Sequence, residues 1–279
     1  MNSMGRSAAK VRIVGAYLIL LAACFAILFP VFWAFINSLK PSLVYVYNPA
    51  AINFPPTLNN YVKVFTFWKF GNFFLNTAVV ATSATVISLI AGTLSAYSFA
   101  RFGTGGKRST LWVLAIRMLP AVAIILPLYI LFDMARLLDT WPALILAHIT
   151  FLLPMVIWMM CEFIRDVPTD LEEAATVDGC SRFGAFLRVV LPVVSPGLAA
   201  TAIFCFLMSF NEFMFALILT GAGHSRTLPV ALSAFWTSRK VMYGEMFAAV
   251  ICVLAPELIL AFSIQKYLVR GLTLGALKG

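Results

Sequence analysis

The chain has 279 residues, of which 62% are hydrophobic and only 11% charged, and its mean hydropathy is +0.96. Soluble domains carry about 25% charged residues, so this composition excludes an ordinary soluble domain and indicates a membrane protein. The net charge of +9 does not indicate nucleic-acid binding, because the basic residues stand mostly singly at the ends of apolar runs. The five cysteines and two histidines show no spacing typical of a metal site or a disulfide framework.

Apolar runs along the chain predict six transmembrane helices, since a helix needs about 20 residues to cross the hydrocarbon core. The run after Arg12 is longer than the core of a signal peptide and is therefore expected to be a retained first span. Lipid cannot satisfy backbone polar groups, so the spans must be helical and the protein an all-α integral membrane protein. The predicted spans cover residues 13–37, 72–99, 111–131, 142–161, 199–220 and 246–265.

Basic residues orient these spans. With the N-terminus inside, they are more frequent in the cytoplasmic segments, most densely at Arg101, Lys107 and Arg108 in one short loop, and both termini are expected to be cytoplasmic. The predicted organisation is a cytoplasmic N-terminus (1–12), a first helix (13–37), an outer loop (38–71), a five-helix core (72–265) that includes a cytoplasmic loop (162–198), and a cytoplasmic tail (266–279).

The loop at 162–198 contains an unusually polar passage. Thr169 and Glu172 have the spacing of a capping box, which predicts that a helix begins there. Gly179 can adopt the left-handed conformation that ends a short helix, and Ser181 can cap a second one. The passage is therefore expected to form two short helices joined by a tight glycine turn. Its small alanines and charged rim suit insertion into a groove on a partner protein.

The same residues carry a longer pattern: Glu173-Ala174-Ala175, three residues, Gly179, nine residues, Val189, one residue and Leu191-Pro192. This pattern resembles the EAA loop of the integral-membrane subunits of ATP-binding-cassette importers, in which Ile usually stands at the position of Val189. Shorter strings, among them Asn59-Asn60-Tyr61 and the ending Gly271 to Gly279, resemble the carbohydrate-importing, maltose-type branch of that family.

The resemblance implies a type I importer permease fold with cytoplasmic coupling helices, located in a bacterial inner membrane. It implies a second permease subunit as heterodimer partner, two ATPase subunits, an extracytoplasmic binding protein that delivers a sugar, and surrounding membrane lipid. It also implies which residues couple the permease to the ATPase: Glu172, Glu173, Ala174, Ala175, Asp178, Gly179, Leu191 and Pro192.

No catalytic site is expected in the chain itself. The string Gly103 to Lys107 fails the phosphate-loop pattern, because Arg101 stands where its first glycine should be and Arg108 follows the lysine. The chain is therefore expected to bind no cofactor or metal and not to be an enzyme. ATP and Mg would be used by the partner ATPase.

Three charged residues lie inside predicted spans, where charge is costly and points to function or to pairing. Arg117 and Glu257 could pair with each other, a structural interpretation, and a direct role in solute binding is the alternative. Glu212 lies on the fifth span. By the i, i+3, i+4, i+7 spacing it shares one helix face with three further residues, which gives as candidate pathway residues Met208, Asn211, Glu212 and Phe215.

That predicted face has two interpretations. Its amide, carboxylate and aromatic groups could contact a sugar, or they could hold helices together against the sister subunit. For the whole chain we expect a permease subunit that lines half of a sugar pathway and couples ATP hydrolysis to alternating access. The alternatives are an importer of a non-sugar solute and an ATP-independent carrier or channel. A membrane scaffold without transport is hard to reconcile with the intramembrane charges.

Overall fold

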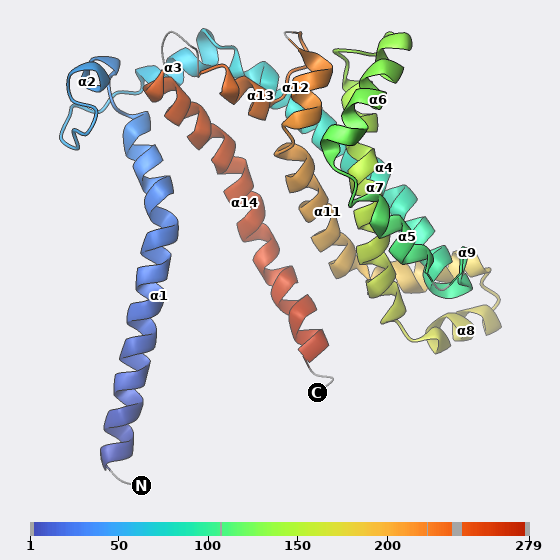
Figure 1. The fold of residues 1–279 in the computed structure, drawn as a ribbon. Helices are drawn as coiled ribbons and strands as arrows, with labels where there is room; N and C mark the ends of the chain where they lie inside the picture. The colour runs from blue at the N-terminus through green and yellow to red at the C-terminus, as the bar shows by residue number, and fades with distance from the viewer. Residues whose placement is uncertain (1–2, 107, 222, 236–241, 277–279) are drawn as a thin grey trace. The chain divides into compact units, whose positions relative to one another are not determined.

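The structure, a computed structural model, describes residues 3–106, 108–221, 223–235 and 242–276, and the regular structure within these ranges is helical (Figure 1). The chain folds as two units. Residues 1–70 and 234–255 belong to unit 1, and residues 71–233 and 256–279 belong to unit 2.

Unit 1 contains the long first helix and the segment that follows it. Its helices are α1 (Ser3–Ser38), α2 (Ser42–Tyr47), α3 (Asn59–Thr66) and the first part of α14 (Tyr243–Ala276). Within residues 12–30 of α1, nearly every side chain is exposed. A helix that is apolar all round and uncovered by its own chain is suited to contact with lipid or with another subunit.

The loop after α1 is organised around a buried lysine. Lys40 has no exposed surface, its Nζ donates a hydrogen bond of 2.8 Å to the carbonyl of Pro49, and it lies 5.1 Å and 5.3 Å from the ring centres of Tyr45 and Phe54. Burial lowers the pKa of this ammonium group. The ring faces partly compensate for the lost water, so Lys40 fixes the start of the segment predicted as an outer loop.

Unit 2 contains the remaining helices, and its chain runs through them in the order of the sequence. They are α4 (Phe70–Phe102), α5 (Ser109–Ile116), α6 (Ala121–Met134), α7 (Trp141–Arg165), α8 (Thr169–Val177), α9 (Arg182–Ala185), the π-helix η1 (Phe186–Val190), α10 (Leu191–Val193), α11 (Ser195–Phe210), α12 (Met214–Thr220), α13 (Leu228–Ser233) and the second part of α14. In this unit α8 and α9 lie at one end, and α6 and α12 lie at the other (Figure 1).

The core of unit 2 lies where α4, α7, η1 and α11 meet. Its fully buried members include Val156, Met160, Ile164 and Val190. Two glycines permit this close packing, because a Cβ on Gly92 would lie 2.6 Å from the Val156 side chain and one on Gly197 would lie 2.6 Å from the Phe163 ring. Small residues at helix contacts are how membrane helices approach closely. The π-helix is part of this core through buried Phe186 and Val190.

The predicted spans correspond to helices, but two of them are interrupted. The third is broken between α5 and α6 at residues 117–120, where Pro120 has an extended ψ and cannot continue the helix. The fifth is broken at residues 211–213 between α11 and α12. By length and hydropathy, four described helices can cross a membrane, and a fifth span results if Arg182–Val193 and Ser195–Phe210, bent by 75°, are counted together. The number of six spans stays a prediction.

The first and last predicted segments also end at other residues than the helices in the structure. The helix expected from residue 13 already begins at Ser3, and the segment expected as a tail from residue 266 continues α14 as far as Ala276. Residues 277–279 of the predicted tail lie outside the described residues. The difference arises because charged side chains end an apolar run without ending a helix, so hydropathy marks the membrane and not the helix boundary.

Candidate functional site

The polar passage forms a compact surface at one end of unit 2, which we call the α8–α9 patch and define as residues 169–185 (Figure 1). The predicted helix begins at Thr169 as expected, but the predicted capping box is wrong. Pro168 is the residue before the first turn, and no side chain caps that turn. Asp170 and Glu172 lie in the first turn, where they favour the positive end of the helix dipole. The Glu172 carboxylate is turned toward α4.

Glu172 anchors α8 to the end of α4. Its Oε2 accepts a hydrogen bond of 2.7 Å from the Tyr97 hydroxyl, and its Oε1 accepts one of 2.5 Å from Arg101 Nε. The Arg101 guanidinium also donates to the carbonyl of Val167 at 2.7 Å, immediately before α8. The side chains of Arg101 and Glu172 are only 9% and 13% exposed. The ion pair is largely buried, and each partner makes a further hydrogen bond, so it fixes α8 against the end of α4.

The turn after α8 has the geometry that the sequence predicts. Gly179 adopts a φ of +88°, in the left-handed region. Its backbone N–H donates to the carbonyl of Thr176, and that of Cys180 donates to the carbonyl of Ala175. These two bonds form a Schellman motif, which satisfies the last carbonyls of α8 and reverses the chain.

The predicted second helix is also present. The Ser181 hydroxyl accepts a hydrogen bond of 3.1 Å from the backbone of Gly184, and α9 then continues without a break into η1 and α10. Leu191 is half-buried, and the exposed Pro192 follows η1 inside this continuous helical segment, where it has no backbone N–H to donate. Because η1 is part of the core, packed side chains connect the α8–α9 patch to α7 and α11.

One face of α8 is free within the described chain. Glu173, Ala174, Val177 and Asp178 all lie exposed on it, and Val177 is 87% exposed. Their spacing places them on one side of a helix, opposite the anchoring Glu172. Two carboxylates around a small alanine and an uncovered valine form a narrow apolar strip with an acidic rim. Such a surface is typical of a helix that enters a groove on a partner.

The predicted pathway stripe on the fifth span is not continuous. Met208 belongs to α11, Phe215 is buried in α12, and Asn211 and Glu212 lie in the break between them. The Glu212 side chain caps the first turn of α12 from the break, because its two carboxylate oxygens accept hydrogen bonds from the backbone N–H groups of Phe215 and Ala216 at 2.9 and 3.1 Å. The expectation of a single helical face was therefore wrong, since an acidic side chain can cap a new helix inside an apolar run.

A buried histidine, which the sequence did not single out for this place, stands beside Glu212. His148 Nε2 lies 3.5 Å from Glu212 Oε2, and its Nδ1 lies 2.6 Å from the Ser209 hydroxyl. The break in the fifth span thus carries a polar cluster that is half-open, since Asn211 is exposed while His148 is fully buried.

The expected pairing of Arg117 with Glu257 is absent among the described residues. Arg117 lies in the break of the third span and its guanidinium contacts the sulfurs of Met155 and Met208. Glu257 is half-buried on α14 with the Asn211 amide beside it, and its Oε1 has no hydrogen-bond partner among the described residues. Arg117 therefore faces α7 and α11, whereas Glu257 lies beside Asn211 at the break of the fifth span.

Comparison with known proteins identifies the family. Residues 84–274 match the profile of the family described as "Binding-protein-dependent transport system inner membrane component", a region that includes the α8–α9 patch and the broken fifth span. The chain belongs to this family. It is a multi-pass inner-membrane permease, a transport subunit with the fold of importer permeases.

Relatives of the permease resemble it over nearly their whole length. The trehalose transport system permease protein SugB of Mycobacterium tuberculosis is 36% identical over 255 residues, which cover 90% of this chain and 93% of the relative. The sulfoquinovosyl glycerol transport system permease protein SmoH of Agrobacterium fabrum is 33% identical, with 90% and 89% covered. Among solved structures, a chain of a bacterial importer of the acidic polysaccharide alginate matches with a TM-score of 0.74 at 20% identity, over 94% of this chain and 98% of that one.

The position of Glu212 in the permease leads to a prediction about stability. We expect Glu212→Ala to lower the stability of the purified permease by about 0.5–2 kcal/mol, because loss of a helix cap has this effect. Glu212→Gln, which keeps one acceptor oxygen, is expected to lose less. Thermal unfolding in detergent measures both. Unchanged unfolding in Glu212→Ala together with altered solute selectivity would show that the carboxylate acts on the solute instead.

Proposed function

We propose that this permease is one subunit of an ATP-driven importer and lines half of the pathway for a sugar or sugar derivative. The observation that carries the proposal is the joint occurrence of the family match and an α8 helix anchored rigidly from behind by Glu172, with its acidic and alanine face left free. The sugar class is supported by the relatives, whose names refer to trehalose and to sulfoquinovosyl glycerol.

The proposed complex has four kinds of subunit. A second permease completes the pathway, two ATPase subunits use ATP and Mg on the cytoplasmic side, and an extracytoplasmic binding protein delivers the solute. Both termini of this chain are on the cytoplasmic side in this arrangement. The permease itself holds neither ATP nor a cofactor.

The mechanism follows from how α8 is connected. Closure of the ATPase dimer moves α8, and the Glu172 contacts pass this movement to α4 while η1 passes it to α7 and α11. Interfaces packed this closely switch between discrete arrangements and do not deform continuously. The pathway therefore alternates between an inward-facing and an outward-facing state. The polar cluster of Asn211, Glu212 and His148 lies at the break of the fifth span, where a solute with hydroxyl groups can find hydrogen-bond partners.

The proposal is tested by reconstitution in proteoliposomes with the second permease, the ATPase and the binding protein. We expect uptake of radiolabelled trehalose or a related disaccharide that requires both ATP and the binding protein. A binding protein that holds an amino acid or a polyamine and no sugar would contradict the sugar class. Uptake that proceeds unchanged without the ATPase would contradict the importer itself.

The free face of α8 gives a separate prediction. Glu173→Lys is expected to weaken binding of the ATPase several-fold, because it reverses the charge of an exposed residue on the docking face without touching the Glu172 anchor. Co-purification of the ATPase at increasing salt measures the effect. The matched control is Glu162→Lys, also exposed but located on α7, and we expect it to leave binding unchanged. If both variants lose ATPase binding equally, the ATPase responds to the net charge of the permease and not to the exposed face of α8.

A further inference from the structure

Unit 1 contains a pocket of about 610 Å³ that the coupling mechanism does not use. We call it the outer pocket; its walls are α2, the end of α3 and the start of α14, and its lining includes Tyr45, Lys63, Trp68, Tyr243 and Glu245. Binding sites for small molecules have volumes of about 300–1,000 Å³. The predicted topology places these segments on the outer side of the membrane, in the first outer loop and just before the sixth span.

The walls of the outer pocket are fixed by a buried asparagine. The Asn60 amide donates hydrogen bonds to the carbonyls of Ser38 and Lys40 at 2.8 and 2.9 Å. Asn60 also packs closely on Gly244, where a Cβ would lie 2.7 Å from its side chain. Asn60 therefore holds α3 against both the end of α1 and the start of α14. A pocket whose walls are fixed in this way loses little conformational entropy when a ligand binds.

Aromatic rings give the outer pocket an apolar surface. Tyr45 and Tyr243 stack with ring centres 5.6 Å apart, and Trp68 packs on Phe235 with ring centres 4.7 Å apart. Although these contacts hold the rings in place, Tyr243 is 44% exposed, and Phe67, which also lines the pocket, is 75% exposed. Exposed rings can cover a ligand that has an apolar face.

An ion pair supplies the polar groups of the pocket. Lys63 Nζ lies 3.1 Å from Glu245 Oε1, and the two side chains are 41% and 10% exposed. Because the two charges compensate each other, the pocket favours a neutral ligand over an ion. An ammonium group has three donors and a carboxylate has about four acceptor sites, so both groups can make further hydrogen bonds. Ligand hydroxyl groups, which both donate and accept, match a donor and an acceptor that lie side by side.

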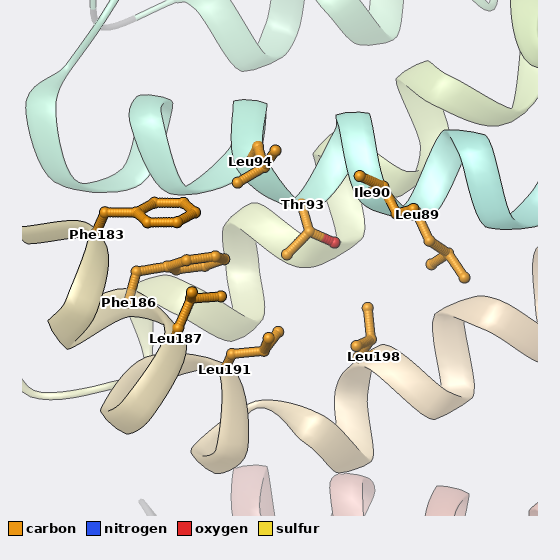
Figure 2. Close-up of a pocket in the computed structure, with 9 residues that line it drawn as sticks. All are labelled: Leu89, Ile90, Thr93, Leu94, Phe183, Phe186, Leu187, Leu191 and Leu198. Atoms are coloured by element: carbon orange, nitrogen blue, oxygen red, sulfur yellow. The ribbon is translucent and has the colours of Figure 1, made fainter.

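A second cavity, in unit 2, shows what these polar groups add. It has a volume of about 310 Å³ and lies between residues 89–94 of α4 and residues 183–198 (Figure 2). Its lining is aliphatic and aromatic apart from Thr93, and no polar atom is exposed on its walls. Such a cavity has no group that could orient a solute by hydrogen bonds, so we assign it no ligand.

We propose that the outer pocket binds a neutral sugar, at a site that shares no residue with the polar cluster of the fifth span. The proposal rests on the proposed function for the sugar class and for the side of the membrane. A sugar ring combines a face of C–H groups with an edge of hydroxyl groups and carries no charge. The aromatic rings match its face, and the Lys63–Glu245 pair matches its edge. The pocket would hold the solute before it enters the pathway.

Photo-labelling tests the proposal on the assembled transporter in nanodiscs, without ATP and without the binding protein. The probe is trehalose that carries a diazirine, and mass spectrometry identifies the labelled peptides. We expect label in the segments 42–46, 63–68 and 242–245, and an excess of unlabelled trehalose should displace it. Tyr243→Ala should lower the label several-fold, because it removes an exposed ring of the pocket. The matched control Tyr47→Ala removes an exposed ring of α2 outside the pocket and should keep the label.

A charge variant makes the test independent of Tyr243. In the wild-type protein we expect trehalose to displace the label several-fold better than its phosphate ester does. Glu245→Gln leaves the Lys63 ammonium group without its counter-charge, so the phosphate ester should become the better competitor. If the variant instead weakens both competitors equally, the ion pair only supports the fold and the proposal is overturned.

Two further results would overturn the proposal. One is a pocket that takes no label in a transporter that does import sugar, a result that leaves the proposed function intact. The other is label that excess trehalose does not displace. Failure of ATP-dependent sugar uptake would contradict the proposed function instead, and the labelling is measured without uptake, so the two failures are distinguishable.

Discussion

Replacing Gly179 by valine is expected to abolish ATP-driven uptake although the permease still inserts in the membrane. At Gly179 the φ angle is +88°, and the position where a Cβ would stand is open space, so the cost is backbone strain and not a clash. A β-branched residue held at positive φ costs about 1–3 kcal/mol, which is enough to shift the turn to another conformation. The Schellman bonds are then lost and the face of α8 no longer meets the ATPase in the required direction. Uptake and membrane content are measured together.

Two variants separate this effect from general damage. Gly179→Asn is expected to keep most of the activity, because asparagine tolerates the left-handed region better than other residues with a side chain. Gly103→Val introduces the same kind of strain at a φ of +60° in a loop with equally open surroundings, and we expect uptake to persist. If Gly179→Val supports uptake at the wild-type rate, the turn has no role in coupling.

Breaking the Arg101–Glu172 pair is expected to be the most damaging change behind α8. In Arg101→Met the Glu172 carboxylate stays in its covered position with only the Tyr97 hydroxyl, and the Val167 carbonyl loses its donor. Removal of one partner from a buried ion pair costs about 3–5 kcal/mol. We expect residues 169–179 to exchange amide hydrogens faster than in the wild-type protein. We also expect the assembled complex to hydrolyse ATP with little uptake, because the ATPase then pushes a helix that no longer moves α4.

The double variant Arg101→Met with Glu172→Met is the control for this prediction. It leaves no unpaired charge, so we expect slower hydrogen exchange than in either single variant and partial recovery of uptake. Losses that simply add in the double variant would show that the two residues act independently and that the pair does not hold α8 to α4.

The sequence predicted the α8–α9 patch well because its signals are local. A helix start at Thr169, a positive φ at Gly179 and a cap at Ser181 depend on residues within a few positions of each other, and all three are present. The partner of Glu172 was not predicted. Tyr97 and Arg101 are one helical turn apart on α4, a spacing that places both on one side, but only the fold brings that side to α8.

The interior of the spans was predicted less well. A hydropathy count treats each apolar run as a straight helix, so it missed the breaks at 117–120 and 211–213. Pro120 was a local sign of the first break. Glu212 gave no such sign, because a carboxylate in an apolar run is compatible with solute binding, with an ion pair and with capping. Only the structure shows that its side chain caps α12.

The most direct test of the account places a photoreactive benzoyl-phenylalanine at Val177 in the assembled transporter and compares it with Tyr47, which is about as exposed but lies in the predicted outer loop. We predict that the probe at position 177 crosslinks to the ATPase subunit and that the probe at position 47 does not. A crosslink from position 47 and none from position 177 would contradict both the orientation of the chain and the role of α8 as the contact through which the ATPase moves the permease.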